Sequence, residues 1–83
     1  MHQKNISLEI ISSSKNEIIN VLWVEIESPT GSFVVGPDHI PLVSIMKKRG
    51  ILTYKQNNGE EVEQEVNGGI FEIYNNKAFA ILT

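Results

Sequence analysis

The few residues of this chain whose types suggest chemistry lie close together. Asp38 and His39 are neighbours, and Ser44 follows a short way downstream. A carboxylate, an imidazole and a hydroxyl are the groups of a hydrolytic triad, but such a triad is recognised by geometry, and neighbouring residues rarely point at one another. We therefore expect His39 to hydrogen-bond locally or to a partner. The sequence predicts a chain that is not an enzyme.

Metal and phosphate binding are equally poorly supported. The chain has two histidines, His2 and His39, and no cysteine, so a zinc site would need further ligands that nothing supplies. Gly68-Gly69 resembles a phosphate-binding loop, yet the Lys-Ser/Thr pair and the helix that such a loop needs are missing. The sequence predicts no cofactor, and it favours a structural bulge at these glycines, within a run that is otherwise extended.

The charge balance argues against nucleic acid as a partner. Lysine and arginine number 7 against 10 aspartates and glutamates, a net charge of -3, which opposes approach to a phosphate backbone. The triplet Lys47-Lys48-Arg49 is too short for a nucleic-acid stripe, and we predict a solvated turn there or, alternatively, a contact for an acidic partner. Since no apolar run reaches the roughly 20 residues that span a bilayer, no direct membrane insertion is expected. The polar start and the lack of cysteine favour the cytoplasm.

The elements that must position these residues are β-strands. Apolar residues alternate with polar ones in short blocks, separated by turn signals such as Pro29-Thr30-Gly31, Asn57-Asn58-Gly59 and Asn75-Asn76, which is the pattern of antiparallel strands. About nine strands can be counted, with 17–20 and 22–27 taken as separate runs. We predict one domain over residues 1–83, an all-β, two-sheet antiparallel β-sandwich of about nine or ten strands.

Residues 36–41 stand apart from this strand pattern. Pro37 and Pro41 cannot donate backbone hydrogen bonds to a sheet, so the segment is predicted to be a fixed loop. A fixed loop loses little entropy on binding. A protein this small also has little interior volume for a deep cleft, and a surface that binds other proteins is the favoured function.

The order of strands and turns from Leu8 to Leu82 resembles the N-terminal β-sandwich domain of the F-type ATP synthase epsilon subunit, which corresponds to the mitochondrial delta subunit. The most specific segment runs from Gly31 to Leu42, where the family has a glycine, an acidic residue, a hydrophobic strand and then Pro-Gly-His-Ala-Pro-Leu. Gly50-Ile51-Leu52 resembles the family's glycine-initiated strand. The segment from Asn67 to Ile73 resembles its Ser-Gly-Gly-hydrophobic-hydrophobic-Glu-Val.

The resemblance implies a non-catalytic rotor subunit of the central stalk that couples the gamma subunit to the c-ring. It implies attachment, through the complex, to the cytoplasmic face of the cell inner membrane. The partner-binding residues carried over from the family face the c-ring's polar loops: Gly31, Ser32, Pro37, Asp38, His39 and Pro41.

This sequence departs from the family at three places. Ser32 stands where a carboxylate is common, and Asp38 replaces a glycine, a change that is tolerable because Asp adopts left-handed backbone angles more readily than most residues. The family usually continues into an α-helical hairpin that regulates ATP hydrolysis, and this sequence ends at Thr83. If the native chain also ends there, we expect a subunit that couples rotation without inhibiting it.

An independent ligand-binding β-sandwich, such as a carbohydrate-binding module, is the alternative. That function needs a platform of exposed aromatic rings, for which Trp23, Tyr54 and Tyr74 are the candidates. Trp23 is predicted on the solvated face of its strand, where packing under a loop and contact with a partner are equally good explanations.

Overall fold

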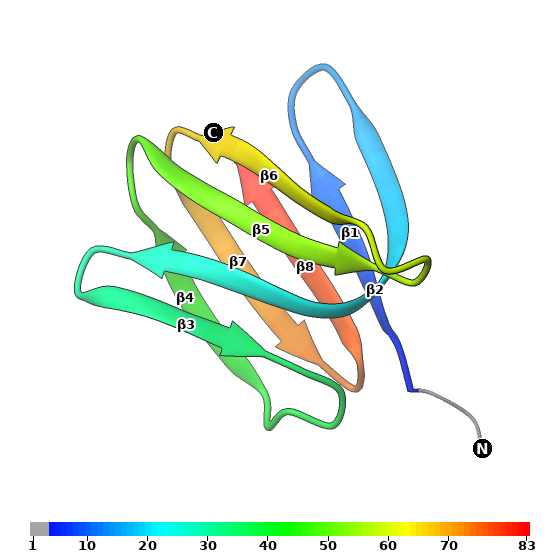
Figure 1. The fold of residues 1–83 in the computed structure, drawn as a ribbon. Helices are drawn as coiled ribbons and strands as arrows, with labels where there is room; N and C mark the ends of the chain where they lie inside the picture. Colours follow the sequence, from blue (N-terminus) through cyan, green and yellow to red (C-terminus); the bar gives the residue numbers. More distant parts are fainter. Residues whose placement is uncertain (1–3) are drawn as a thin grey trace.

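Eight β-strands form the protein in a computed structural model that describes residues 4–83; His2, discussed above as a possible metal ligand, lies outside the described residues. Figure 1 shows the strands curled into two layers, which confirms the all-β sandwich class. No helix occurs within residues 4–83, and so none there could cross a membrane. The strands are β1 (Ile6–Ile11), β2 (Asn16–Ser28), β3 (Gly31–Val35), β4 (Leu42–Met46), β5 (Gly50–Gln56), β6 (Glu61–Val66), β7 (Gly69–Tyr74) and β8 (Lys77–Leu82).

The two layers belong to one continuous hydrogen-bonded sheet. The strand order is β4-β7-β8-β1-β2-β5-β6, and β3 pairs with β2 on the edge opposite to β5. The long strand β2 joins the layers, because its first half pairs with β1 and its second half pairs with β5 and β3. In Figure 1, β3 lies in front of β4. One feature differs from the antiparallel prediction: β1 and β8 pair in parallel.

The strand count of eight falls slightly below the predicted nine or ten because two expected strands are one. Residues 17–20 and 22–27 both belong to β2, and the pairing with β5 shifts register between Val21 and Trp23. Such a bulge changes which residues face inward. Val21 and Val24 are both fully buried, whereas strict alternation would place them on opposite faces.

The core lies between the two layers. It consists of inward-facing residues from all eight strands and includes no buried polar or charged residue among residues 4–83. Phe71 is the largest fully buried side chain. Strand β6 shows the alternation most simply, because its glutamates are exposed while Val66 is buried, as predicted.

The predicted turns are confirmed, with one correction. Asn57-Asn58-Gly59 joins β5 to β6, and Asn75 and Asn76 have the two positive φ angles of a tight hairpin turn between β7 and β8. The bulge predicted at Gly68-Gly69 is wrong. Gly68 lies between two strands and Gly69 begins the second of them: β6 pairs with β5, whereas β7 pairs with β4 and β8.

Candidate functional site

The candidate site is the loop between β3 and β4, which faces the tight turn between β7 and β8. Asp38 has φ 64, so it occupies the left-handed region that Asp tolerates better than most residues. The predicted tolerance of an aspartate at this position is confirmed. Asn76, in the facing turn, is close enough to bond with it, although the two residues are 38 positions apart in the sequence.

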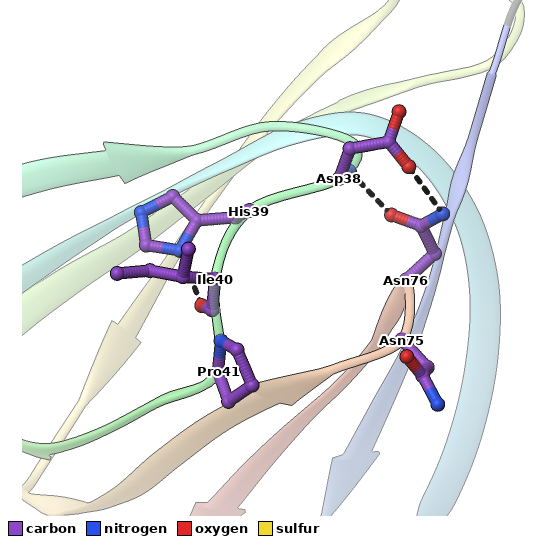
Figure 2. A pocket seen from close by; sticks show the side chains of 6 residues that line it. All are labelled: Asp38, His39, Ile40, Pro41, Asn75 and Asn76. Carbon is purple, nitrogen blue, oxygen red and sulfur yellow. Dashed lines mark hydrogen bonds between the residues drawn. The ribbon is translucent and has the colours of Figure 1, made fainter.

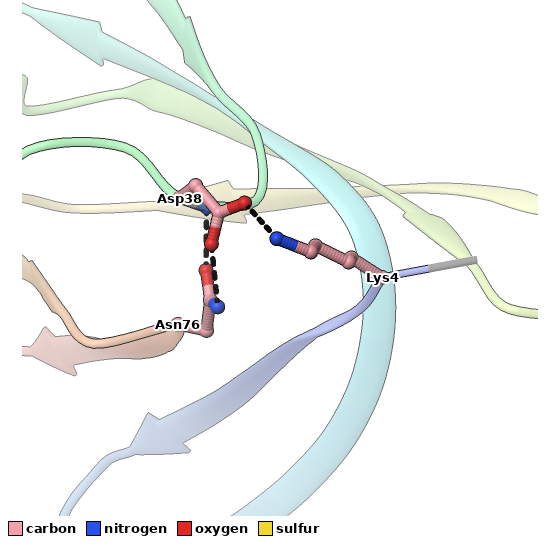
Figure 3. A network of polar contacts seen from close by, with 3 residues as sticks. All are labelled: Lys4, Asp38 and Asn76. Carbon is pink, nitrogen blue, oxygen red and sulfur yellow. Dashed lines mark hydrogen bonds and ion pairs between the residues drawn. The ribbon is translucent and has the colours of Figure 1, made fainter. Parts of the chain in front are cut away.

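A network of polar contacts braces the loop (Figure 3). The backbone N–H of Asp38 donates to Asn76 Oδ1 at 2.6 Å, and Asn76 Nδ2 donates back to Asp38 Oδ1 at 3.1 Å. The Lys4 ammonium donates to the other carboxylate oxygen of Asp38. The hydrogen bond from Lys4, followed by that from Asn76, lowers the pKa of Asp38 below its ordinary value. Asp38 is therefore ionised at neutral pH, and three separate segments meet at its carboxylate.

His39 and Ile40 lie on the outer side of this braced loop. The Nδ1 atom of His39 is 2.7 Å from the carbonyl oxygen of Ile40, so the imidazole hydrogen-bonds locally. The Ile40 side chain is 75% exposed. Figure 2 shows the two side chains beside Pro41, across from the Asn75-Asn76 turn. Between them lies an open groove of about 430 Å³, lined by Asp38, His39, Ile40, Pro41, Asn75 and Asn76.

The three candidates for a hydrolytic triad have other hydrogen-bond partners in the structure. His39 bonds to the Ile40 carbonyl, Ser44 donates its hydroxyl to the Ile45 carbonyl at 3.3 Å, and Asp38 bonds to Asn76 and Lys4. No hydrogen bond joins the three candidates to one another within the described chain. Residues 4–83 also contain no cluster of three or more potential metal-ligating side chains.

The structure divides the six predicted partner-binding residues into two groups. Pro37, Asp38, His39 and Pro41 belong to the braced loop, whereas Gly31 and Ser32 lie where β3 begins, at its other end. The five residues of β3 span four steps of about 3.3 Å, so its two ends lie about 13 Å apart. The turn that carries Gly31 is polar and locally bonded, since Ser28 Oγ donates to the Gly31 carbonyl at 2.7 Å. The six residues therefore form two surfaces.

Sequence reasoning missed Lys4, Ile40 and Asn76. The sequence assigns Asn76 only to a hairpin turn, and nothing in the spacing relates it to Asp38. A two-residue turn with αL geometry does favour asparagine, but the contact depends on the sandwich bringing β3, β7 and β8 to one end. Ile40 had a usable signal: it is an apolar residue between polar and proline neighbours in a segment predicted to lie outside the sheet.

The other candidate features have structural explanations. Lys47, Lys48 and Arg49 are exposed in the turn between β4 and β5, as predicted. The aromatic platform of the alternative function is not formed. Tyr54 is buried and Trp23 is half-buried, and Tyr74 is exposed on the other layer. Burial, with a smaller contribution from Glu17, raises the pKa of the Tyr54 hydroxyl above 10.0.

Fold and site together define a small β-sandwich whose loop between β3 and β4 is braced by polar contacts. Its sequence matches the family model of the β-sandwich domain of the ATP synthase delta/epsilon chain over residues 5–82. The chain belongs to this family, which confirms the resemblance noted from its motifs. No curated protein matches it.

Solved structures with this fold include chains of two mitochondrial ATP synthases. A chain of the Euglena gracilis OSCP/F1/c-ring assembly superposes with a TM-score of 0.86 at 17% identity over 94% of this chain. A chain of the Tetrahymena thermophila central stalk and c-ring superposes with a TM-score of 0.80 at 11% identity over 100% of this chain. The match covers 50% of the Euglena chain and 66% of the Tetrahymena chain.

Proposed function

We propose that this chain is a non-catalytic central-stalk subunit of an F-type ATP synthase, which couples the gamma subunit to the c-ring. The family membership over residues 5–82 carries this proposal. The fold is shared with chains of two assemblies whose descriptions name the c-ring. Work of this kind needs rigid contact surfaces and no chemistry, and the braced loop meets that requirement.

Two separate surfaces suit a subunit that contacts two neighbours. The turn at Gly31 and Ser32 offers hydroxyl and backbone groups, whereas the loop from Pro37 to Pro41 offers an imidazole and an apolar side chain. Torque passed between two proteins requires attachment to both of them. We assign all six residues to partner contact, and each surface is to be tested separately.

The test measures binding of the full chain to purified cognate gamma subunit and to the cognate c-ring. The expected result is specific binding to both. His39→Ala should weaken binding through the loop, and Ser32→Arg should weaken binding through the turn at the other end of β3. Ser13→Arg is the matched control, because Ser13 is also exposed but lies in the turn between β1 and β2.

His39→Ala is a sharper probe than a change that includes Asp38. Asp38 holds the loop to Asn76 and Lys4, so its loss would disturb the loop's shape as well as its surface. Among residues 4–83, His39 bonds only to the neighbouring Ile40 carbonyl, and its replacement should leave the melting temperature nearly unchanged. If the wild-type chain binds neither gamma nor the c-ring, the proposed function is wrong.

Membrane attachment would follow from the complex. The proposed assembly holds the chain at a membrane surface without inserting it. The cytoplasmic face of the inner membrane stays a prediction from the sequence, and the two structural neighbours come from mitochondria.

A further inference from the structure

Asparagine is followed by glycine at two places in this chain, Asn58-Gly59 and Asn67-Gly68. A glycine in this position leaves its backbone nitrogen free to attack the asparagine side chain, because no Cβ shields that nitrogen. The attack closes a succinimide ring and converts the amide to an acid. The two pairs share this reactive sequence, but the structure places them in different surroundings.

The reacting atoms of the first pair are both held in hydrogen bonds. Asn58 Oδ1 accepts the Glu60 N–H at 2.9 Å, which fixes the side-chain amide. The Gly59 N–H donates to the Gln56 carbonyl at 2.9 Å, so the attacking nitrogen is engaged in the turn. Glu60 and Glu61 are exposed beside this pair, and their negative charge opposes loss of a proton from the Gly59 nitrogen. The fold therefore protects Asn58.

The reacting atoms of the second pair are free within residues 4–83. The Asn67 side chain is exposed and makes no hydrogen bond there, and the Gly68 N–H makes none either. Their peptide unit accepts one bond at its carbonyl, where Thr83 Oγ1 donates to the Asn67 oxygen at 2.9 Å. Oxygen and nitrogen of one peptide unit share charge by resonance. A donor on the oxygen therefore favours the deprotonated, nucleophilic form of the Gly68 nitrogen.

Positive charge also lies beside the second pair. The Lys48 side chain passes over Gly68, because a Cβ built on Gly68 would lie 3.5 Å from Lys48 Cγ. Two positive side chains against one negative should stabilise the anion that forms at the Gly68 nitrogen. Gly68 is buried, but the group that it attacks belongs to the preceding residue and need not enter from solvent. An adjoining open hollow of about 350 Å³ is lined by Arg49, Glu65, Val66 and Asn67.

We propose that Asn67 is a site of spontaneous deamidation in the folded chain, whereas Asn58 is protected from it. The Gly68 nitrogen gives its proton to a hydroxide ion and forms a bond to Cγ of Asn67. The bond between Cγ and the side-chain nitrogen then breaks, and this nitrogen takes a proton from water and leaves as ammonia. Water adds to either carbonyl of the succinimide and opens it to aspartate or isoaspartate. This inference is independent of the proposed function.

The modification changes the connection between β6 and β7. Aspartate keeps the backbone as it is and adds a negative charge next to Lys48 and Arg49. Isoaspartate carries the backbone through the side chain and so lengthens it just before Gly69, where β7 approaches the Ile81 carbonyl closely. Both products alter a surface that the unmodified chain presents as an uncharged amide.

The test incubates the full chain at mildly alkaline pH, folded in buffer and unfolded in concentrated urea. Cleavage after glutamate separates the two sites, because the glutamates of β6 lie between them, and mass spectrometry follows each amide as it becomes an acid. In the folded chain Asn67 should react at least about fivefold faster than Asn58, whose two hydrogen bonds must first break. In urea the two rates should agree within about threefold, since exposed charges contribute little.

A second measurement tests the contact with Thr83. Thr83→Val keeps the shape of the side chain but removes the hydroxyl, and it should slow Asn67 in the folded chain by roughly two- to tenfold without changing its rate in urea. Thr53→Val is the matched control, because Thr53 pairs with Glu63 on β6 and does not bond to Asn67; it should leave the Asn67 rate unchanged.

Three outcomes would contradict this account. If Asn58 reacts as fast as Asn67 in the folded chain, or if the ratio of the two rates is no larger in buffer than in urea, the assignment of Asn67 is wrong. If Asn67 reacts in Thr83→Val at least as fast as in wild type, the hydroxyl does not activate the peptide. Binding to gamma and to the c-ring is measured separately, so none of these results bears on the proposed function.

Discussion

Gly69 at the start of β7 is the position where one added methyl group should do the most damage. Its φ is 132, a left-handed value that side chains other than glycine rarely adopt, and a Cβ built on it would lie 2.1 Å from the Ile81 carbonyl oxygen. Since β7 pairs with β8 at this point, the carbonyl cannot move away without breaking the ladder. Gly69→Ala should therefore strain the backbone and force two strands apart.

The magnitude can be worked from these two effects. Strain at such a backbone angle costs about 1–3 kcal/mol, and forcing extra volume into a packed site costs about 1–3 kcal/mol more. At about 0.05–0.15 kcal/mol per residue, a domain of this length has a free energy of unfolding of only about 4–12 kcal/mol. A loss of about 3 kcal/mol would lower the melting temperature by roughly 12–24 °C.

Thermal unfolding followed by circular dichroism provides the assay, with Gly36→Ala as the matched control. A methyl group on Gly36 would meet no atom within 4 Å, and the residue has no left-handed φ. Gly36→Ala should therefore leave the melting temperature unchanged or raise it slightly. If Gly69→Ala melts within about 4 °C of wild type, a shift worth at most about 1 kcal/mol, the close approach of β7 and β8 is not as the structure has it.

Three further predictions concern polar groups. Glu27→Ala removes the carboxylate oxygen that accepts the Ile51 N–H at 2.7 Å and should destabilise the fold by about 1 kcal/mol, measured by urea denaturation. Lys4→Ala should raise the carboxyl titration midpoint of Asp38 in an NMR titration, because the pKa of Asp38 is lowered chiefly by Lys4; the stabilisation linked to Asp38 exists above its unfolded pKa and disappears as the pH falls through the lower folded value. Burial raises the pKa of Tyr54 above 10.0, so stability should fall above about pH 10, where the unfolded chain ionises first, and ultraviolet titration of a Tyr74→Phe variant should show this delay.

The fold class was predictable because the relevant signals are local. Alternation in β6 and the turn residues at Asn57-Asn58-Gly59 depend on neighbours in the chain, and both appear as predicted. The bulge in β2 was not predictable in this way. It places Val21 and Val24 on the same buried side, and this shift depends on β5 as a pairing partner, which the sequence of β2 alone does not reveal.

The parallel pairing of β1 with β8 has the same origin. These strands lie at opposite ends of the sequence, and Leu8 pairs with Ala78. No turn residue specifies such a contact, because the register is set by how the intervening strands curl. The error at Gly68-Gly69 is related, because glycines in an extended run can indicate either a bulge or a close backbone approach. The change of pairing partners between β6 and β7 excludes the bulge, and a Cβ on Gly69 would lie 2.1 Å from the Ile81 carbonyl oxygen.

In the candidate site, too, the features set by neighbouring residues were predictable and those set by distant contacts were not. The sequence identifies the loop, since two prolines around Asp38 and His39 can be read directly, but it does not reveal that Asn76 and Lys4 fix the loop's shape. The other predicted contacts, at Gly31 and Ser32, lie at the far end of β3, as the hydrophobic strand between them and the loop predicts. An extended strand keeps its two ends apart, whatever binds to either of them. Residues close together in a motif can therefore lie at opposite ends of one strand, and their contributions to partner contact have to be tested separately.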